Sequence, residues 1–137
     1  MGVAIDTSVL VALERRGIEL VDALPADASD VYVPAPVVVE LWIGVELADS
    51  AERRASRLLK IHALLEGTTL LPFDERVAPT YAKIYVSLRR AGTPVPANDL
   101  AIGALALHFG HELLVGPDDE GHFRRIQGLT VRVLGKS

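Results

Sequence analysis

Acidic side chains recur in this sequence where a charge is unexpected, next to or inside apolar stretches. Asp6 follows the run "VAI", Glu40 interrupts "VVVELWI", and Asp99 stands near the start of the apolar segment "NDLAIGALALHFG". Asp118 and Asp119 follow the run "ELLV" and a Gly-Pro pair. A charge on an apolar face is costly unless another group pairs with it or binds it. The positions of these acids therefore predict a partner or a ligand.

The chemistry that these carboxylates favour is that of a hard metal ion. If the acids converge in the folded chain, their mutual repulsion raises their pKa values unless a cation holds them. Oxygen ligands without cysteine or histidine suit Mg²⁺, with Mn²⁺ as a possible substitute. Such a cation polarises a phosphate group, activates a water molecule and stabilises the leaving oxygen.

Several of the acids also have an ordinary explanation at helix starts. Asp6, or Thr7 or Ser8 after it, could cap the helix that follows. Asn98 or Asp99 could cap the helix that they open, where a negative charge also suits the helix dipole. Taken one at a time, these are the more common uses of such residues.

The remaining acids divide between turns and an unexplained helix position. Asp118 and Asp119 are typical turn residues. Glu40 shares its helix face with mostly apolar neighbours, and capping does not explain it, although its carboxylate could reach solvent from the edge of that face. Two of the acidic positions follow apolar runs that we interpret as strands. Considered together, the five acids are better explained by one shared binding site than by five separate structural roles.

The elements expected to position these acids alternate between strands and helices. Short apolar runs predict strands at 3–5, 31–33, 68–73, 112–115 and 129–134. Helical patterns cover 7–17, 18–24, 37–48, 51–66, 75–92 and 98–110. This alternation predicts an α/β fold around a mainly parallel sheet. Sheets of that kind bind ligands beyond the carboxyl ends of their strands, where the strand order reverses.

Length and composition restrict the class of protein. The 137 residues suit one domain, 1–137, and 50% of them are hydrophobic, which excludes disorder. No apolar run approaches the roughly 20 residues of a membrane-spanning helix, and the first residues lack the pattern of a secretory signal. The absence of cysteine fits a reducing cytoplasm. A net charge of −4 argues against a protein that coats duplex DNA.

Four segments together resemble the PIN-domain ribonucleases, and among these the VapC-type toxins of bacterial toxin–antitoxin pairs. They are "IDTSVLVAL", "VVELWIGV", "ANDLAIGALALHFG" and "LLVGPDDEGHFRRIQGL", which begin at residues 5, 38, 97 and 113. The resemblance extends over almost the whole chain. It implies a PIN-like three-layer α/β/α sandwich with a mainly parallel, roughly five-stranded central sheet.

The same resemblance implies roles for the acids. A Mg²⁺-dependent endoribonuclease would use Asp6, Glu40, Asp99 and Asp119 as its catalytic cluster. Asp6 and Asp99 would bind the metal directly, and Glu40 and Asp119 directly or through water. Asp118 remains the alternative to Asp119, because the family usually has a hydroxyl residue two places before the fourth acid and this chain has a proline there.

The resemblance also implies supporting residues and partners. Thr7, Ser8, Asn98 and Asp118 would support the catalytic cluster. RNA would be the substrate, and a VapB-type antitoxin would occupy the acidic groove. The toxin itself would form a homodimer through apolar helix surface.

Two other functional classes remain open from the sequence. A catalytically silent module with the same fold would have lost one or more acids, whereas this chain retains a candidate at every position. A phosphorylatable receiver-like domain would need an acidic pair near the first strand and a lysine after the last, and this chain has neither.

Other conspicuous residues are better explained by the fold or by exposure to solvent than by a functional site. Three arginine pairs could grip phosphates, but such pairs usually lie on solvated faces; they are Arg15–Arg16, Arg89–Arg90 and Arg124–Arg125. The four histidines lack a metal-binding spacing. Trp42, at helical spacing with apolar neighbours, is expected in the core.

Overall fold

A five-stranded parallel sheet forms the centre of the protein. The structure is a computed structural model, which describes residues 2–28 and 30–135. The strands are β1 (Gly2–Ile5), β2 (Asp30–Pro34), β3 (Thr69–Leu71), β4 (Glu112–Val115) and β5 (Val131–Val133). They lie in the order β3-β2-β1-β4-β5, and every neighbouring pair is parallel. The predicted α/β fold with a mainly parallel sheet of about five strands is confirmed.

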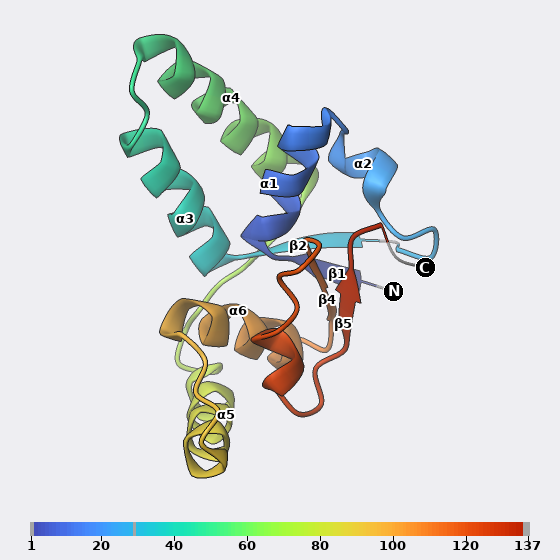
Figure 1. Cartoon of the computed structure of the whole chain (residues 1–137), viewed down its shortest axis with the longest axis vertical. Coiled ribbons are helices and arrows are strands. Elements are labelled where there is room, and N and C mark those ends of the chain that lie inside the picture. Colours follow the sequence, from blue (N-terminus) through green and yellow to red (C-terminus); the bar gives the residue numbers. More distant parts are fainter. Residues whose placement is uncertain (1, 29, 136–137) are drawn as a thin grey trace.

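Helices cover both faces of this sheet (Figure 1). The helices are α1 (Thr7–Arg16), α2 (Leu20–Ala23), α3 (Ala35–Glu46), α4 (Ala51–Gly67), α5 (Ala78–Ala91) and α6 (Ala97–His108), followed by the 3₁₀ turn η1 (Phe123–Arg125). In Figure 1, α1, α2 and α4 lie on one side of the sheet, and α5 and α6 lie on the other. Because parallel crossovers are right-handed, the chain must change face when it returns from β3 to β4.

The strand order reverses between β1 and β4, so the predicted ligand crevice lies beyond the carboxyl ends of these two strands. Asp6 follows β1 directly, and its backbone N–H donates a hydrogen bond of 2.9 Å to the Leu114 carbonyl of β4. The register therefore places the first acid of the sequence at the mouth of this crevice.

The core is apolar on both sides of the central strands. Residues 3–5 of β1 and 113–115 of β4 are buried, as are 102–106 of α6. Strands that are covered on both faces carry continuous apolar runs, which explains why "VAI" and "LLV" show no alternation. Gly103 of α6 lies close to Ile126, where a Cβ would have no room. The rigid centre that results holds the carboxyl ends of β1 and β4 in place.

Local signals explain where the helices begin and end. The helices α1 and α5 end at Gly17 and Gly92, whose φ angles of 64° and 71° lie in the left-handed region that glycine adopts readily. Pro36 and Pro79 lie in the first turns of α3 and α5, as predicted, because a proline there removes no intrahelical hydrogen bond. The helix α5 begins at Ala78, three residues later than the predicted segment 75–92.

The prediction that Trp42 belongs to the core is wrong. The tryptophan is 40% exposed on α3, and its neighbours Val39 and Ile43 are 55% and 52% exposed. On α4, which packs against α3, Ile61 is buried but Leu59 is 71% exposed. Part of the apolar pattern of this helix pair therefore marks a surface and not the interior. In the part of the chain that the structure describes, no helix is long and apolar enough to span a bilayer.

Candidate active site

Asp6 caps a helix at the carboxyl end of β1. Its backbone is extended, with φ −86° and ψ 157°, and its Oδ2 accepts hydrogen bonds from the backbone N–H of Ser8 (3.2 Å) and from Ser8 Oγ (2.5 Å). The capping explanation for Asp6 is thus correct, but it does not exclude a second role. Asp6 is only 6% exposed, so its charge is held in a largely dehydrated position.

Ser8 joins the two strands that border the crevice. Its Oγ donates to Asp6 and accepts a hydrogen bond of 2.9 Å from the Gly116 N–H, directly after β4. A side chain at Gly116 would place its Cβ 2.7 Å from the Ser8 carbonyl oxygen and 3.1 Å from Asp119 Oδ2. Glycine is therefore required for this close approach, and the same contacts place the Asp119 carboxylate beside the first turn of α1.

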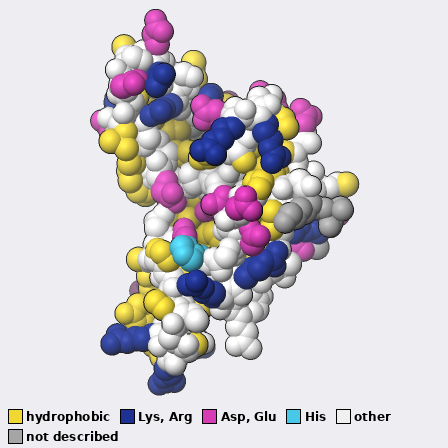
Figure 2. All heavy atoms as spheres, in the orientation of Figure 1, with side chains coloured by type: hydrophobic (Ala, Val, Ile, Leu, Met, Phe, Trp, Pro, Cys, Tyr) yellow, Lys and Arg dark blue, Asp and Glu magenta, His cyan; other side chains and the backbone are white. Residues whose placement is uncertain are grey.

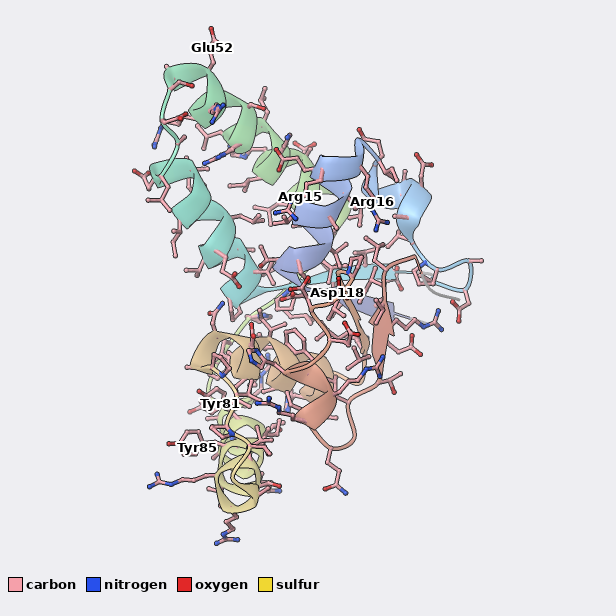
Figure 3. All side chains as sticks on the ribbon, viewed as in Figure 1. Arg15, Arg16, Glu52, Tyr81, Tyr85 and Asp118 are labelled. Carbon is pink, nitrogen blue, oxygen red and sulfur yellow. The ribbon has the colours of Figure 1, made fainter. Side chains whose placement is uncertain are left out.

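The Gly-Pro-Asp-Asp sequence forms a tight turn, which separates the roles of its two aspartates. The Asp119 N–H donates to the Gly116 carbonyl (3.2 Å), with Pro117 and Asp118 at the two central positions. The φ of Asp118 is 70°, the left-handed value that the third position of a type II turn needs. Figure 3 labels Asp118 in this loop, which passes the start of α1. The geometry places Asp118 at the left-handed position of the turn and Asp119 at its end.

Glu40 and Asn98 connect the helices α3 and α6. Asn98 Nδ2 donates a hydrogen bond of 2.5 Å to Glu40 Oε1. The alternative that Asn98 caps its helix is wrong, because the N-cap of α6 is Pro96 and no side chain caps this end. The amide therefore orients a carboxylate that is 58 residues away in sequence.

Asp99 is not a helix cap either, and it has a partner that the sequence did not reveal. It lies in the first turn of α6, and its Oδ2 is 2.7 Å from Nδ1 of His122. The histidine spacing argued against a metal site and gave no reason to expect this contact. The only available signal was the position of His122 in the family-like segment that also carries Asp119.

Three of the acids repel one another. Burial raises the pKa of Asp6, the charge of Asp99 raises it further, and the hydrogen bonds from Ser8 oppose both effects. Burial likewise raises the pKa of Glu40, with further contributions from the charges of Asp6 and Asp99, against the lowering effect of the hydrogen bond from Asn98. The structure therefore brings Asp6, Glu40 and Asp99 within electrostatic range of one another.

The donor chemistry of this cluster fits a hydrated divalent ion better than a fully coordinated one. Within 2–28 and 30–135, no three acidic or histidine side chains form a ready-made coordination sphere. Mg²⁺ does not need one, because it usually binds through one or two carboxylates and keeps several waters. The buried Thr7 Oγ1 makes no hydrogen bond within the described chain, so it could accept one from a metal-bound water.

Basic side chains border the acidic cluster. Figure 2 shows acidic side chains gathered in the middle of one face beside a histidine, with basic side chains on either side. Arg15 and Arg16 lie in the last turn of α1, and Figure 3 shows them away from the start of that helix, which Asp6 caps. Arg124 and Arg125 form part of η1, where Arg125 donates a hydrogen bond of 2.8 Å to the Pro94 carbonyl.

Comparison with known proteins identifies the family. The PIN domain family matches residues 3–129. Ribonuclease VapC1 of Rickettsia felis is 33% identical over 131 residues, which cover 96% of this chain and 95% of the relative. The fold is similar to that of VapBC-5 from Mycobacterium tuberculosis, with a TM-score of 0.73 and 28% identity over 96% of each chain. It is also similar to FitAcB from Neisseria gonorrhoeae, with a TM-score of 0.74 and 31% identity over 94% of this chain and 95% of the other. The chain belongs to the PIN domain family and, within it, to the VapC ribonucleases.

Proposed function

We propose that this protein is a toxin that hydrolyses RNA phosphodiester bonds with the help of Mg²⁺ held by the acidic cluster. The observation that carries the proposal is the grouping of Asp6, Glu40 and Asp99: burial raises the pKa values of Asp6 and Glu40, and the charges of their acidic neighbours raise them further. A bound Mg²⁺ would supply charge neutralisation, polarisation of the phosphate and an activated water. Mn²⁺, which has similar ligand preferences, is a possible substitute.

Each acid has a role in this proposal. Asp6 and Asp99 bind the cation directly, and Glu40 and Asp119 bind it directly or through its waters. Glu40 or Asp119 also orients the attacking water. Supporting residues hold these acids in position, since Ser8 donates to Asp6 and Asn98 donates to Glu40.

The surface around the cluster suits a polyanion in spite of the net charge of −4. Figure 2 shows basic side chains on either side of the acids, and such side chains can contact phosphates on either side of the scissile bond. A catalytically silent module would have no use for four retained acids. That alternative predicts RNA binding without cleavage, so the same assay tests it.

The decisive experiment is cleavage of total RNA by the purified, partner-free chain, with Mg²⁺ and with EDTA. Asp99→Asn should reduce cleavage by about 10²-fold or more, because it removes a charge that neutralises the cation. The fold should survive, since an asparagine oxygen can still accept from His122. Asp22→Asn, on the exposed face of α2, is the matched control and should cleave normally. Cleavage that persists in EDTA, or in Asp99→Asn, would contradict the proposal.

The apolar surface of α3 supports a second part of the proposal, a VapB-type antitoxin as partner. This surface surrounds a shallow hollow of about 450 Å³ that is lined by Val38, Val39, Trp42, Ile43, Glu46 and Leu47. An exposed apolar patch of this kind is typical of a protein–protein contact. Leu47→Ser should abolish capture of a co-expressed antitoxin, whereas Val21→Ser, an equally exposed apolar residue at 74%, should not. Equal capture by both variants would exclude this surface.

A homodimer is the third part of the proposal. The helix α5 leaves Tyr85 and Val86 exposed, at 47% and 41%. Figure 3 shows Tyr85 on the far side of α6 from α3, so a second copy could bind there while a partner occupies the α3 hollow. The mass of the partner-free chain in solution tests this part: a monomer at all concentrations would refute it.

A further inference from the structure

The contact between His122 and Asp99 joins two elements that both carry acids of the cluster. Asp99 comes from α6. His122 lies three residues after Asp119, which ends the turn that follows β4. Because a carboxylate can only accept hydrogen bonds, the 2.7 Å contact requires that Nδ1 of His122 carries the proton. Among the described residues, this is the only side-chain hydrogen bond that Asp99 receives.

The packing around η1 fixes the position of the imidazole. Phe123, the residue after His122, is 2% exposed and packs close to Gly103 of α6, and Ile126 lies against the same glycine. Arg125 of the same turn donates to the Pro94 carbonyl in the loop before α6. The backbone on the C-terminal side of His122 is therefore attached to α6 by apolar packing and by a hydrogen bond.

The pair remains accessible from the site. The side chains of His122 and Asp99 are 43% and 30% exposed, so substrate and solvent can reach them. A purely structural hydrogen bond between core elements would be expected to lie deeper. An exposed carboxylate without a fixed partner would populate several rotamers, and its ordering on metal binding would cost free energy.

We propose that His122 is a positioning residue: it orients the Asp99 carboxylate for the divalent cation and couples the Asp119 loop to α6. Hydrogen-bonding partners of metal ligands commonly have this function, and their removal weakens metal affinity by about 10- to 100-fold. The inference rests on the proposed function, because it assumes that Asp99 binds the cation. It extends that proposal to a residue that contributes neither a metal ligand nor a carboxylate.

The test is calorimetric titration of Mn²⁺ into the purified chain, alongside RNA cleavage. His122→Phe keeps a planar ring but removes the Nδ1 donor, and it should weaken Mn²⁺ binding by about 10-fold or more. His122→Asn keeps a donor near the same place and should recover most of the affinity. His62→Phe, on the exposed side of α4, is the matched control and should bind Mn²⁺ like the wild type. Circular dichroism of each variant checks that the fold is retained.

The possible results separate the two proposals. Unchanged Mn²⁺ affinity in a folded His122→Phe would overturn the positioning role, even if cleavage fell. Equal losses in His122→Phe and His122→Asn would also overturn it, because a donor at this position would then make no difference. A wild-type chain that binds Mn²⁺ but cleaves no RNA would refute the nuclease proposal, while the affinities of the variants would still test His122.

Discussion

Gly116→Ala tests most directly whether the close approach of β4 to the start of α1 builds the site. The new Cβ would lie 2.7 Å from the Ser8 carbonyl oxygen and 3.0 Å from the Ser8 carbonyl carbon. These are backbone atoms of a helix start that is attached to β1, so they cannot rotate away as a flexible side chain would. The φ of Gly116 is not positive, so alanine adds a steric conflict without backbone strain.

The magnitude follows from two opposing effects. Overpacking costs about 1–3 kcal/mol of the free energy of unfolding. The smaller entropy of the unfolded alanine chain offsets about 0.4–1 kcal/mol of that. Because the obstructing atoms are backbone, we expect a net loss of about 1–2 kcal/mol. For a chain of 137 residues this lowers Tm by roughly 3–8 °C.

The effect on activity should exceed the effect on stability. Ser8 donates to Asp6, and Asp119 Oδ2 would lie 3.1 Å from the new methyl group, so relief of the overlap displaces two groups of the site. A displacement of about 1 Å can reduce the rate by about 10²-fold. Cleavage should be measured well below the melting transition, so that unfolding does not contribute.

Gly44→Ala is the matched control. Gly44 lies inside α3, and a Cβ there would meet nothing within 4 Å. Alanine should therefore stabilise the helix by about 0.5–1 kcal/mol and leave cleavage unchanged. If Gly116→Ala were as stable and as active as Gly44→Ala, the inferred contact between the β4 turn and α1 would be wrong.

Two further predictions concern pH. Because burial raises the folded-state pKa of Asp6, ionisation of Asp6 destabilises the fold, and this loss appears as pH rises through the raised pKa. Asp6→Asn can still accept a hydrogen bond from Ser8, and it should lose cleavage yet melt higher than the wild type at pH 7. The difference in Tm should shrink toward pH 4. A lower Tm of the variant at pH 7 would contradict this explanation. His111 stacks on Tyr32 with ring centroids 3.9 Å apart, and burial lowers its pKa, partly opposed by Asp30. Its stabilising contribution should therefore be complete above about pH 6.5 and decline as pH falls through the lowered pKa. His111→Phe should remove this decline, and identical Tm profiles of the variant and the wild type from pH 7.5 to 5 would refute it.

The sequence contained enough information for the sheet and for the position of the first acid. Apolar runs without alternation indicate strands that are covered on both faces, and a charge directly after such a run must lie at a strand end. That reasoning correctly placed Asp6 directly after β1 and the Asp118–Asp119 pair shortly after β4. The different backbone roles of these two aspartates could not be predicted, because the φ of 70° at Asp118 depends on the local turn.

The connections between the acids and their partners could not be predicted. The Asn98–Glu40 hydrogen bond joins residues 58 positions apart, and the His122–Asp99 contact joins residues 23 apart. Both depend on how α6 packs against α3 and η1, and hydrophobic periodicity does not specify that packing. Trp42 shows the same limit, because periodicity indicates which face of a helix is apolar but not whether this chain or another molecule covers it.

The way in which the site holds its charges favours a cation from outside the chain. Neutral donors hold the first two acids, since Ser8 donates a hydrogen bond to Asp6 and Asn98 donates one to Glu40. Asp99 accepts a hydrogen bond from a histidine nitrogen. Throughout 2–28 and 30–135, the lysine and arginine ion pairs go to other carboxylates, namely Asp27, Asp49, Asp74, Glu14, Glu46 and Glu112. A cluster that served only stability would gain from a nearby arginine, which would lower the pKa values that are raised in this structure. A fixed internal cation would also compete with Mg²⁺ for the same oxygens. Under the proposed function, the pKa values of Asp6 and Glu40, which burial raises most, are the consequence of leaving this position open to the cation.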